Sequence, residues 1–194
     1  IICECKYWEA PIPQNVIHSF RTVLADIGAN YGFIISKNGF QSGAYEAASN
    51  SNLNLFTWND FQNYFRENWV KARTFEISKI NKDLKTYISA GFPVYFKEEY
   101  KNLSPEDFKE FERLYTMYFH TGFYSMNHDY IDLETKEFDI KYFEQHIKES
   151  KKIYSNDFAS YEDFFNFLIK DANEGVIKFD KLFKKSLRSV NGIF

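Results

Sequence analysis

Short apolar runs alternate with helix-type hydrophobic spacing over the first 66 residues, and this alternation limits the possible folds more than any other feature of the sequence. The strand-like runs are residues 2–7, 32–36 and 53–57. Between the first two runs, apolar residues recur from Val16 to Ile27 at the spacing of one helical face. Further helices are predicted at residues 43–50 and 59–66. This order is typical of an α/β layer in which right-handed crossovers join parallel strands.

The first strand-like run contains a carboxylate and an amine, in the tripeptide Glu4-Cys5-Lys6. Because strand side chains alternate between faces, Glu4 and Lys6 share one face, and Cys3 and Cys5 share the other. We expect the strand to be buried, and burying a charge is costly unless the charge is paired or binds a metal. The pair therefore indicates a functional site, and divalent-metal hydrolysis is one chemistry that fits it.

The same acid-x-Lys spacing recurs further along the chain, mostly in charged stretches that look helical. There, solvated ion pairs are the ordinary explanation. Only Glu4-Cys5-Lys6 has a strand-like context. The other occurrences begin at Asp83, Glu99, Asp107, Glu134, Asp139 and Glu149.

The first 66 residues resemble the Mrr-like restriction endonucleases of the PD-(D/E)xK nuclease superfamily. The resemblance rests on Glu4-Cys5-Lys6, on Gly28-Ala29 before the second strand, and on the segment from Ile34-Ile35-Ser36 through Gly39-Phe40-Gln41-Ser42-Gly43-Ala44 to Ala48. It implies a restriction-endonuclease-like α/β core, in which helices flank a central mixed sheet. It also implies a magnesium-dependent DNA endonuclease that hydrolyses phosphodiester bonds in restriction or phage defence.

Carried over position by position, the resemblance implies Glu4 as a magnesium ligand and the backbone carbonyl of Cys5 as another. It implies Lys6 as the catalytic amine that orients or activates the attacking water, and Mn²⁺ could replace Mg²⁺. The chemistry is consistent, because magnesium prefers hard oxygen ligands and keeps several waters. The ion polarises the phosphoryl group and lowers the pKa of bound water, while an ammonium stabilises developing charge.

The family also uses an acid, usually Asp, on the strand or turn before the E-x-K strand. No residue precedes Ile1 in the sequence. We therefore expect that an upstream portion with this acid, its strand and a first helix is missing, so that residues 1–66 are the C-terminal part of a nuclease core. If Ile1 is the true terminus, the metal site is incomplete. The alternative function is then a catalytically inactive nuclease-like protein used for DNA binding or assembly.

The two cysteines and the first histidine offer weaker signals. The spacing of Cys3 and Cys5 does not suit a disulfide, and without nearby histidines they make a poor zinc site, so we expect buried thiols that pack under the sheet. His18 lies one turn into the first predicted helix and is either an exposed polar residue or a phosphate contact.

Composition fits a soluble protein, which we expect to be cytoplasmic and to have no membrane partner. DNA as the partner is what the resemblance implies. The net charge is only -3, and no apolar run approaches the roughly 20 residues that span a bilayer. The charge balance does not itself indicate nucleic-acid binding, although local basic patches contact phosphates whatever the net charge.

Residues 67–194 form a mainly helical region for which we expect a role in recognition, dimerisation or regulation. Helices are predicted at residues 70–90, from Pro105 onward with Ser104 as N-cap, and at 140–154, 161–173 and 179–190. A basic cluster near the end either contacts DNA phosphates or forms a solvated helix face. It consists of Lys178, Lys181, Lys184, Lys185 and Arg188, opposed by Asp180.

Aromatic residues crowd two segments of this region, around residues 108–124 and 164–167. Such rings can stack on unpaired bases, but at helical spacing a hydrophobic core or an oligomer interface is the commoner role. We expect a homodimer in which residues 104–125 or 158–169 supply the contact, because a duplex has two strands to cut and C2 symmetry presents two identical sites.

Overall fold

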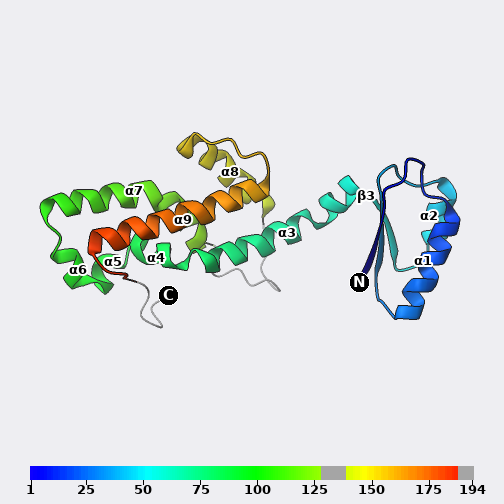
Figure 1. Cartoon of the computed structure of the whole chain (residues 1–194), viewed down its shortest axis with the longest axis horizontal. Coiled ribbons are helices and arrows are strands. Elements are labelled where there is room, and N and C mark those ends of the chain that lie inside the picture. Colours follow the sequence, from blue (N-terminus) through cyan, green and yellow to red (C-terminus); the bar gives the residue numbers. More distant parts are fainter. Residues whose placement is uncertain (128–138, 188–194) are drawn as a thin grey trace. The chain divides into compact units, whose positions relative to one another are not determined.

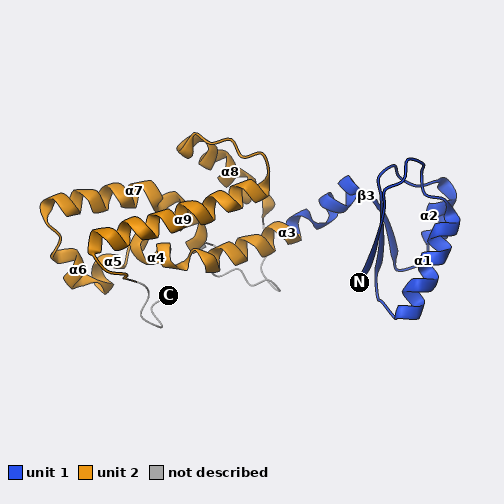
Figure 2. Cartoon of the chain, viewed as in Figure 1, with its two compact units in different colours: residues 1–67 blue, residues 68–194 orange. Residues whose placement is uncertain are grey.

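The computed structural model describes residues 1–127 and 139–187, in a chain that divides into two compact units (Figure 2). Unit 1 comprises residues 1–67 and unit 2 residues 68–194. The boundary falls inside helix α3 (Trp58–Ile80).

Unit 1 is a three-layer arrangement around a small parallel sheet of order β1-β2-β3. The strands are β1 (Ile2–Lys6), β2 (Gly32–Ser36) and β3 (Leu53–Thr57). Helices α1 (Gln14–Ile27) and α2 (Ser42–Ala48) form the two crossovers and lie on one face of the sheet (Figure 1). The predicted strand–helix–strand order is confirmed, and all strand pairings among the described residues are parallel.

The helical face of the sheet is packed with aliphatic and small side chains. Ile34 of β2 is completely buried beneath the inner residues of α1, Ile17 and Phe20. The buried alanines of α2 allow that helix to approach α1 closely. α1 ends at Gly28, whose φ of 69° is a left-handed conformation that glycine adopts without strain.

The opposite face of the sheet is covered unevenly. Phe33 of β2 stacks on Phe56 of β3 with ring centroids 5.7 Å apart, and rings from the first turns of α3 pack over them. Cys3 and Cys5 of β1 are both exposed on this face. The prediction of buried thiols is therefore wrong, because β1 is the edge strand of the described sheet and the rings cover only its two neighbours.

Unit 2 is built from helices that pack around two hydrophobic cores. Helices α4 (Lys82–Ile88), α7 (Pro105–Asn127) and α9 (Tyr161–Phe183) contact one another (Figure 1). Their core contains Tyr87, stacked on Phe179 at 4.8 Å. The second core joins α3, α8 (Ile140–Tyr154) and α9 around Phe143 and Phe165. The short helices α5 (Phe92–Tyr95) and α6 (Lys97–Lys101) lie between α4 and α7 in the sequence.

At two places the structure has one continuous helix where the sequence pattern predicted two separate helices. The predicted break between residues 66 and 70 is absent, because no glycine or proline interrupts α3 there, and the helix ends instead just before Asn81. The predicted break at Asn173-Glu174-Gly175 is also wrong, since α9 runs through it to Phe183. The last part of the predicted helix 179–190, residues 188–190, lies outside the described residues.

No helix within residues 1–127 and 139–187 has the length and apolar content that a membrane crossing requires.

Candidate active site

Glu4 and Lys6 lie side by side on one face of β1, and Lys6 is its last residue, at the end of the sheet where all three parallel strands finish. Lys6 Nζ is 2.5 Å from Glu4 Oε1. The side chains are partly accessible, with exposed fractions of 34% for Glu4 and 20% for Lys6. In open parallel sheets, ligands bind beyond the carboxyl ends of the strands, so this ion pair occupies a position suited to a substrate.

The ion pair forms one wall of an open groove of about 280 Å³. Helix α1 supplies the opposite wall, with polar atoms from Asn15 and Ser19 and apolar surface from Phe20. Ser19 Oγ donates a hydrogen bond to the Asn15 carbonyl at 3.0 Å. His18 is exposed on the same helix but does not line the groove. The groove therefore brings one carboxylate and one ammonium together with uncharged hydrogen-bonding groups.

The backbone of β1 turns the Cys5 carbonyl toward the open edge of the described sheet. Ile2 N–H bonds to the Tyr31 carbonyl, and the Lys6 carbonyl accepts from Lys37 N–H at 3.1 Å. Residues of a strand alternate in the direction of their backbone groups, so Cys5, between Glu4 and Lys6, directs its own groups away from β2. Its carbonyl oxygen is available to a ligand at that edge.

The segment that follows β1 is held tightly against the turn after β2. Asn38 Nδ2 donates to the carbonyls of Trp8 and Glu9, each at 3.0 Å. Lys37 Nζ forms an ion pair with Glu9 Oε1 at 2.6 Å. We define residues 7–9 as the aromatic loop. Sequence reasoning placed Tyr7 inside the first strand, but β1 ends at Lys6 and the Tyr7 side chain is 81% exposed.

The oxygen groups at β1 fit a magnesium ion in type but supply only part of its coordination. The Glu4 carboxylate and the Cys5 carbonyl are hard oxygen donors, and magnesium commonly completes such partial sets with water. Within the described part of the chain, no group of three or more His, Cys, Asp and Glu side chains could hold a metal ion. Any ion at β1 would therefore be held by few groups from these residues.

A comparison with protein families found a match to the Mrr_cat family, described as a restriction endonuclease, over residues 1–65. Residues 1–65 are therefore similar to the restriction endonuclease domain that this family describes. The resemblance inferred from Glu4-Cys5-Lys6 and the following segments is thus confirmed for this part of the chain. Searches among curated proteins and among solved structures found no significant match.

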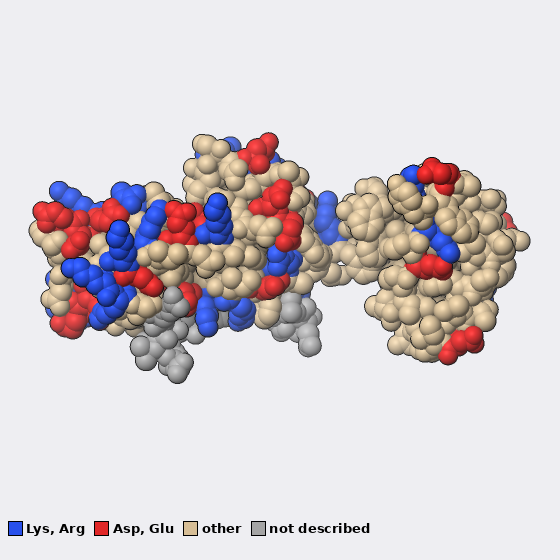
Figure 3. All heavy atoms as spheres, viewed as in Figure 1, with Lys and Arg blue, Asp and Glu red and all other residues tan. Residues whose placement is uncertain are grey.

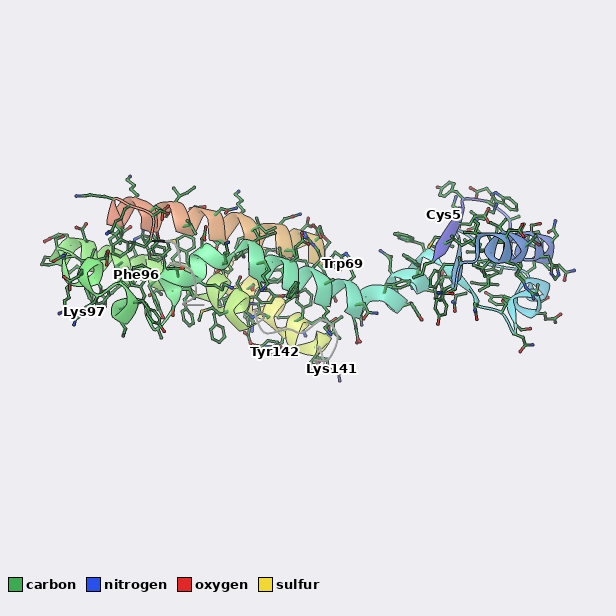
Figure 4. The ribbon with its side chains drawn as sticks, turned by 90° about the horizontal axis from the view of Figure 1, so that it is seen from below. Cys5, Trp69, Phe96, Lys97, Lys141 and Tyr142 are labelled. Atoms are coloured by element: carbon green, nitrogen blue, oxygen red, sulfur yellow. The ribbon has the colours of Figure 1, made fainter. Side chains whose placement is uncertain are left out.

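Two of the four described members of the basic cluster predicted near the end of the chain form ion pairs. Lys178 Nζ lies 2.5 Å from Glu174 Oε1, and Lys185 Nζ lies 2.7 Å from Glu99 Oε1. Arg188 lies outside the described residues. On the face shown in Figure 3, lysines and arginines of unit 2 are interspersed with acids, which does not make that face a basic patch.

The aromatic segments of unit 2 lie mainly in its cores. Phe111, Tyr118 and Tyr124 on α7, and Phe164 and Phe165 on α9, are buried. The exposed rings of α7 are Phe119 and Phe123. Most of these aromatic residues therefore belong to a hydrophobic core, the commoner of the roles predicted for them.

Proposed function

We propose that the protein is a magnesium-dependent endodeoxyribonuclease of the PD-(D/E)xK type, with the core of a restriction-endonuclease fold in unit 1. The observation that carries this proposal is the Glu4–Lys6 ion pair, which lies in a groove at the carboxyl end of β1 within the matched family domain. Phage defence by restriction is the biological role that best suits such an enzyme.

Each residue of the tripeptide has a role in this proposal. Glu4 and the Cys5 carbonyl would hold the metal ion, with Mn²⁺ as a possible substitute. When bound, the ion would polarise the phosphodiester and acidify a water ligand. Lys6 would donate hydrogen bonds to the charge that develops on the phosphoryl oxygens. Its pairing with Glu4 orients the amine into the groove before substrate binds.

The test compares two acid-x-Lys pairs of the same chain in plasmid and oligonucleotide cleavage. Glu4→Ala and Lys6→Ala should each lower magnesium-dependent cleavage by at least about 100-fold, the usual effect of losing a charge-stabilising or proton-transferring group. Glu149→Ala and Lys151→Ala, at the same spacing on helix α8, should cleave at the parental rate.

Folding must be separated from chemistry in this comparison. Circular dichroism should show that all four variants retain the parental helix content. Parental cleavage by Glu4→Ala or Lys6→Ala would refute the site. An intact protein that cuts no DNA with Mg²⁺ or Mn²⁺ would favour the second candidate, a nuclease-like protein that binds DNA without cutting it.

We further propose that unit 2 mediates self-association, so that two copies present two active sites to a duplex. The supporting feature is a row of rings on α7. Tyr115, Phe119 and Phe123 follow one another at four-residue spacing, with centroids 5.5 and 5.4 Å apart. Phe119 and Phe123 are 38% and 40% exposed, a large apolar area for a solvent-facing helix surface.

A further inference from the structure

The aromatic loop places two exposed rings directly beside the candidate catalytic amine. The Tyr7 side chain is 81% exposed and that of Trp8 43% exposed. Lys6 Nζ lies 5.1 Å from the centroid of the Trp8 ring, and Lys37 Nζ lies 4.3 Å from that of Tyr7. The loop therefore offers ring surface and ammonium groups beside the groove that Glu4 and Lys6 line.

The loop backbone is fixed although its rings are exposed. The two hydrogen bonds from Asn38 and the Lys37–Glu9 ion pair tie the loop to the turn after β2. Three residues beyond the loop, Ile12 N–H bonds to the Gly39 carbonyl, and Gln41 N–H bonds to the Ile12 carbonyl. A surface held in place before binding loses little conformational entropy when a ligand arrives. The Tyr7 and Trp8 rings are thus exposed on a preorganised backbone, which favours binding of a ligand from outside unit 1.

The charges around the loop show which contact is favoured. Lys6 is paired with Glu4 and Lys37 with Glu9, so the four charges next to the rings cancel. Over residues 1–67 as a whole, acids outnumber the four basic residues, which are Lys6, Arg21, Lys37 and Arg66. Binding to intact duplex DNA depends mainly on neutralising phosphates with lysine and arginine. Unit 1 has few basic residues for binding duplex phosphates. The exposed rings of Tyr7 and Trp8 are therefore the main groups beside the site that could contact DNA.

Rings can contact a base only where a base face is free. In a continuous duplex, neighbouring base pairs cover both faces of each base, whereas unpaired bases stack readily on exposed aromatic side chains. We propose, on the basis of the proposed nuclease function, that Tyr7 and Trp8 stack on unpaired bases beside the scissile phosphate. The preferred substrate is then DNA whose strands are locally unpaired at the cut, such as a bubble, flap or single strand.

The experiment uses three DNA substrates of one sequence: a duplex, the same duplex with a central unpaired bubble, and the single strand. The fluorescent base 2-aminopurine in the bubble reports stacking, because stacking on an aromatic ring quenches its emission. Quenching is measured on binding in the presence of Ca²⁺, and cleavage is measured with Mg²⁺. The intact protein should cut the bubble faster than the duplex and quench the probe.

Tyr7→Ala and Trp8→Ala should each weaken binding to the bubble by about 10-fold, since stacking on one ring is worth about 1–3 kcal/mol per base. Both should lose the quenching, and Tyr7→Phe and Trp8→Phe should restore it. Tyr31→Ala removes another exposed ring of unit 1, which lies before the opposite end of β2, and should change nothing. Binding to the single strand should also fall only weakly with added salt.

Several outcomes would overturn the proposal. Equal cleavage of bubble and duplex by the intact protein is one, and quenching that survives both alanine substitutions is another. A marked loss of thermal stability in Tyr7→Ala would show that the ring packs against protein and is not free for a base. If no substrate is cut at all, the nuclease function fails, but the quenching by intact protein and its loss in the variants still decide whether the rings bind bases.

Discussion

Asp171 illustrates how single polar residues are accommodated between the helices of unit 2. Its carboxylate accepts a hydrogen bond from Thr121 Oγ1 at 2.6 Å, and the Tyr154 hydroxyl lies 2.8 Å from the same Thr121 oxygen. Because Thr121 donates to Asp171, Tyr154 donates to Thr121. Burial raises the pKa of the Tyr154 hydroxyl to about 12. The chain of bonds joins α7, α8 and α9.

Asp171 should make stability depend on pH. Burial raises the pKa of this carboxyl above the value of 3.8 expected for an unfolded chain, although the Thr121 hydrogen bond opposes the rise. The folded state thus holds the proton to higher pH than the unfolded state. The protonated carboxyl therefore stabilises the folded state. This stabilisation is fully present below pH 3.8 and is lost as the pH rises through the raised pKa.

Urea unfolding followed by circular dichroism across this pH range would test the effect. Asp171→Asn should lose the fall in stability, because the amide carries no charge at any pH. Asp163→Asn, which changes an exposed acid of the same helix, should retain it. Identical pH profiles for the parent and Asp171→Asn would show that the carboxyl is not perturbed.

At the scale of elements, the strands and helices of unit 1 were predicted well from the sequence, because the spacing of the apolar residues matches the faces that are buried in the structure. The period of the apolar residues in α1 and the lengths of the three strand-like runs were enough to place them in one parallel sheet. The burial of β1 was misjudged, since an apolar run cannot show whether a neighbour covers it. The Glu4–Lys6 pair followed from strand alternation, but its groove did not, because α1 reaches it only through the folded crossover.

The sequence predicted a break in α9 at Gly175, because glycine commonly interrupts helices. In the structure this glycine instead serves close packing inside a continuous helix. A Cβ atom at this position would lie 2.9 Å from the Tyr118 ring and 3.0 Å from Leu84 Cδ1. The glycine thus lets α9 approach α7 and α4 closely in the first core of unit 2.

Gly175→Ala should therefore destabilise unit 2 by about 1–3 kcal/mol through overpacking. The expected sign is opposite to the gain of up to about 1 kcal/mol that alanine gives over glycine in an exposed helix. Asn173→Ala, at an exposed position of the same helix, provides the control and should be neutral or slightly stabilising. Urea midpoints at a fixed pH measure both, and a stabilised Gly175→Ala would contradict the tight approach.

Self-association is the question that concerns the whole molecule. The sequence suggested two contact segments, residues 104–125 and 158–169. In the second, Phe158, Phe164 and Phe165 are buried in the core between α3, α8 and α9. The exposed row on α7 is therefore the better candidate.

Phe119→Lys combined with Phe123→Lys should convert a dimer to a monomer, because two charges would replace the centre of an apolar contact. Sedimentation of the intact protein at micromolar concentration measures the change. Ile177→Lys alters an apolar side chain of α9 that is 67% exposed and should leave the dimer intact. A strictly monomeric parent, with or without DNA, would exclude the dimer.

The bonds from Asn38 to Trp8 and Glu9 also determine when the site can be completed during synthesis. These two carbonyls precede their donor by 30 and 29 positions in the chain. On the ribosome, β1 emerges before α1 and β2, and its loop can be anchored only after both have followed. A nascent chain that stops before residue 38 therefore has Glu4-Cys5-Lys6 but not the anchored loop beside it.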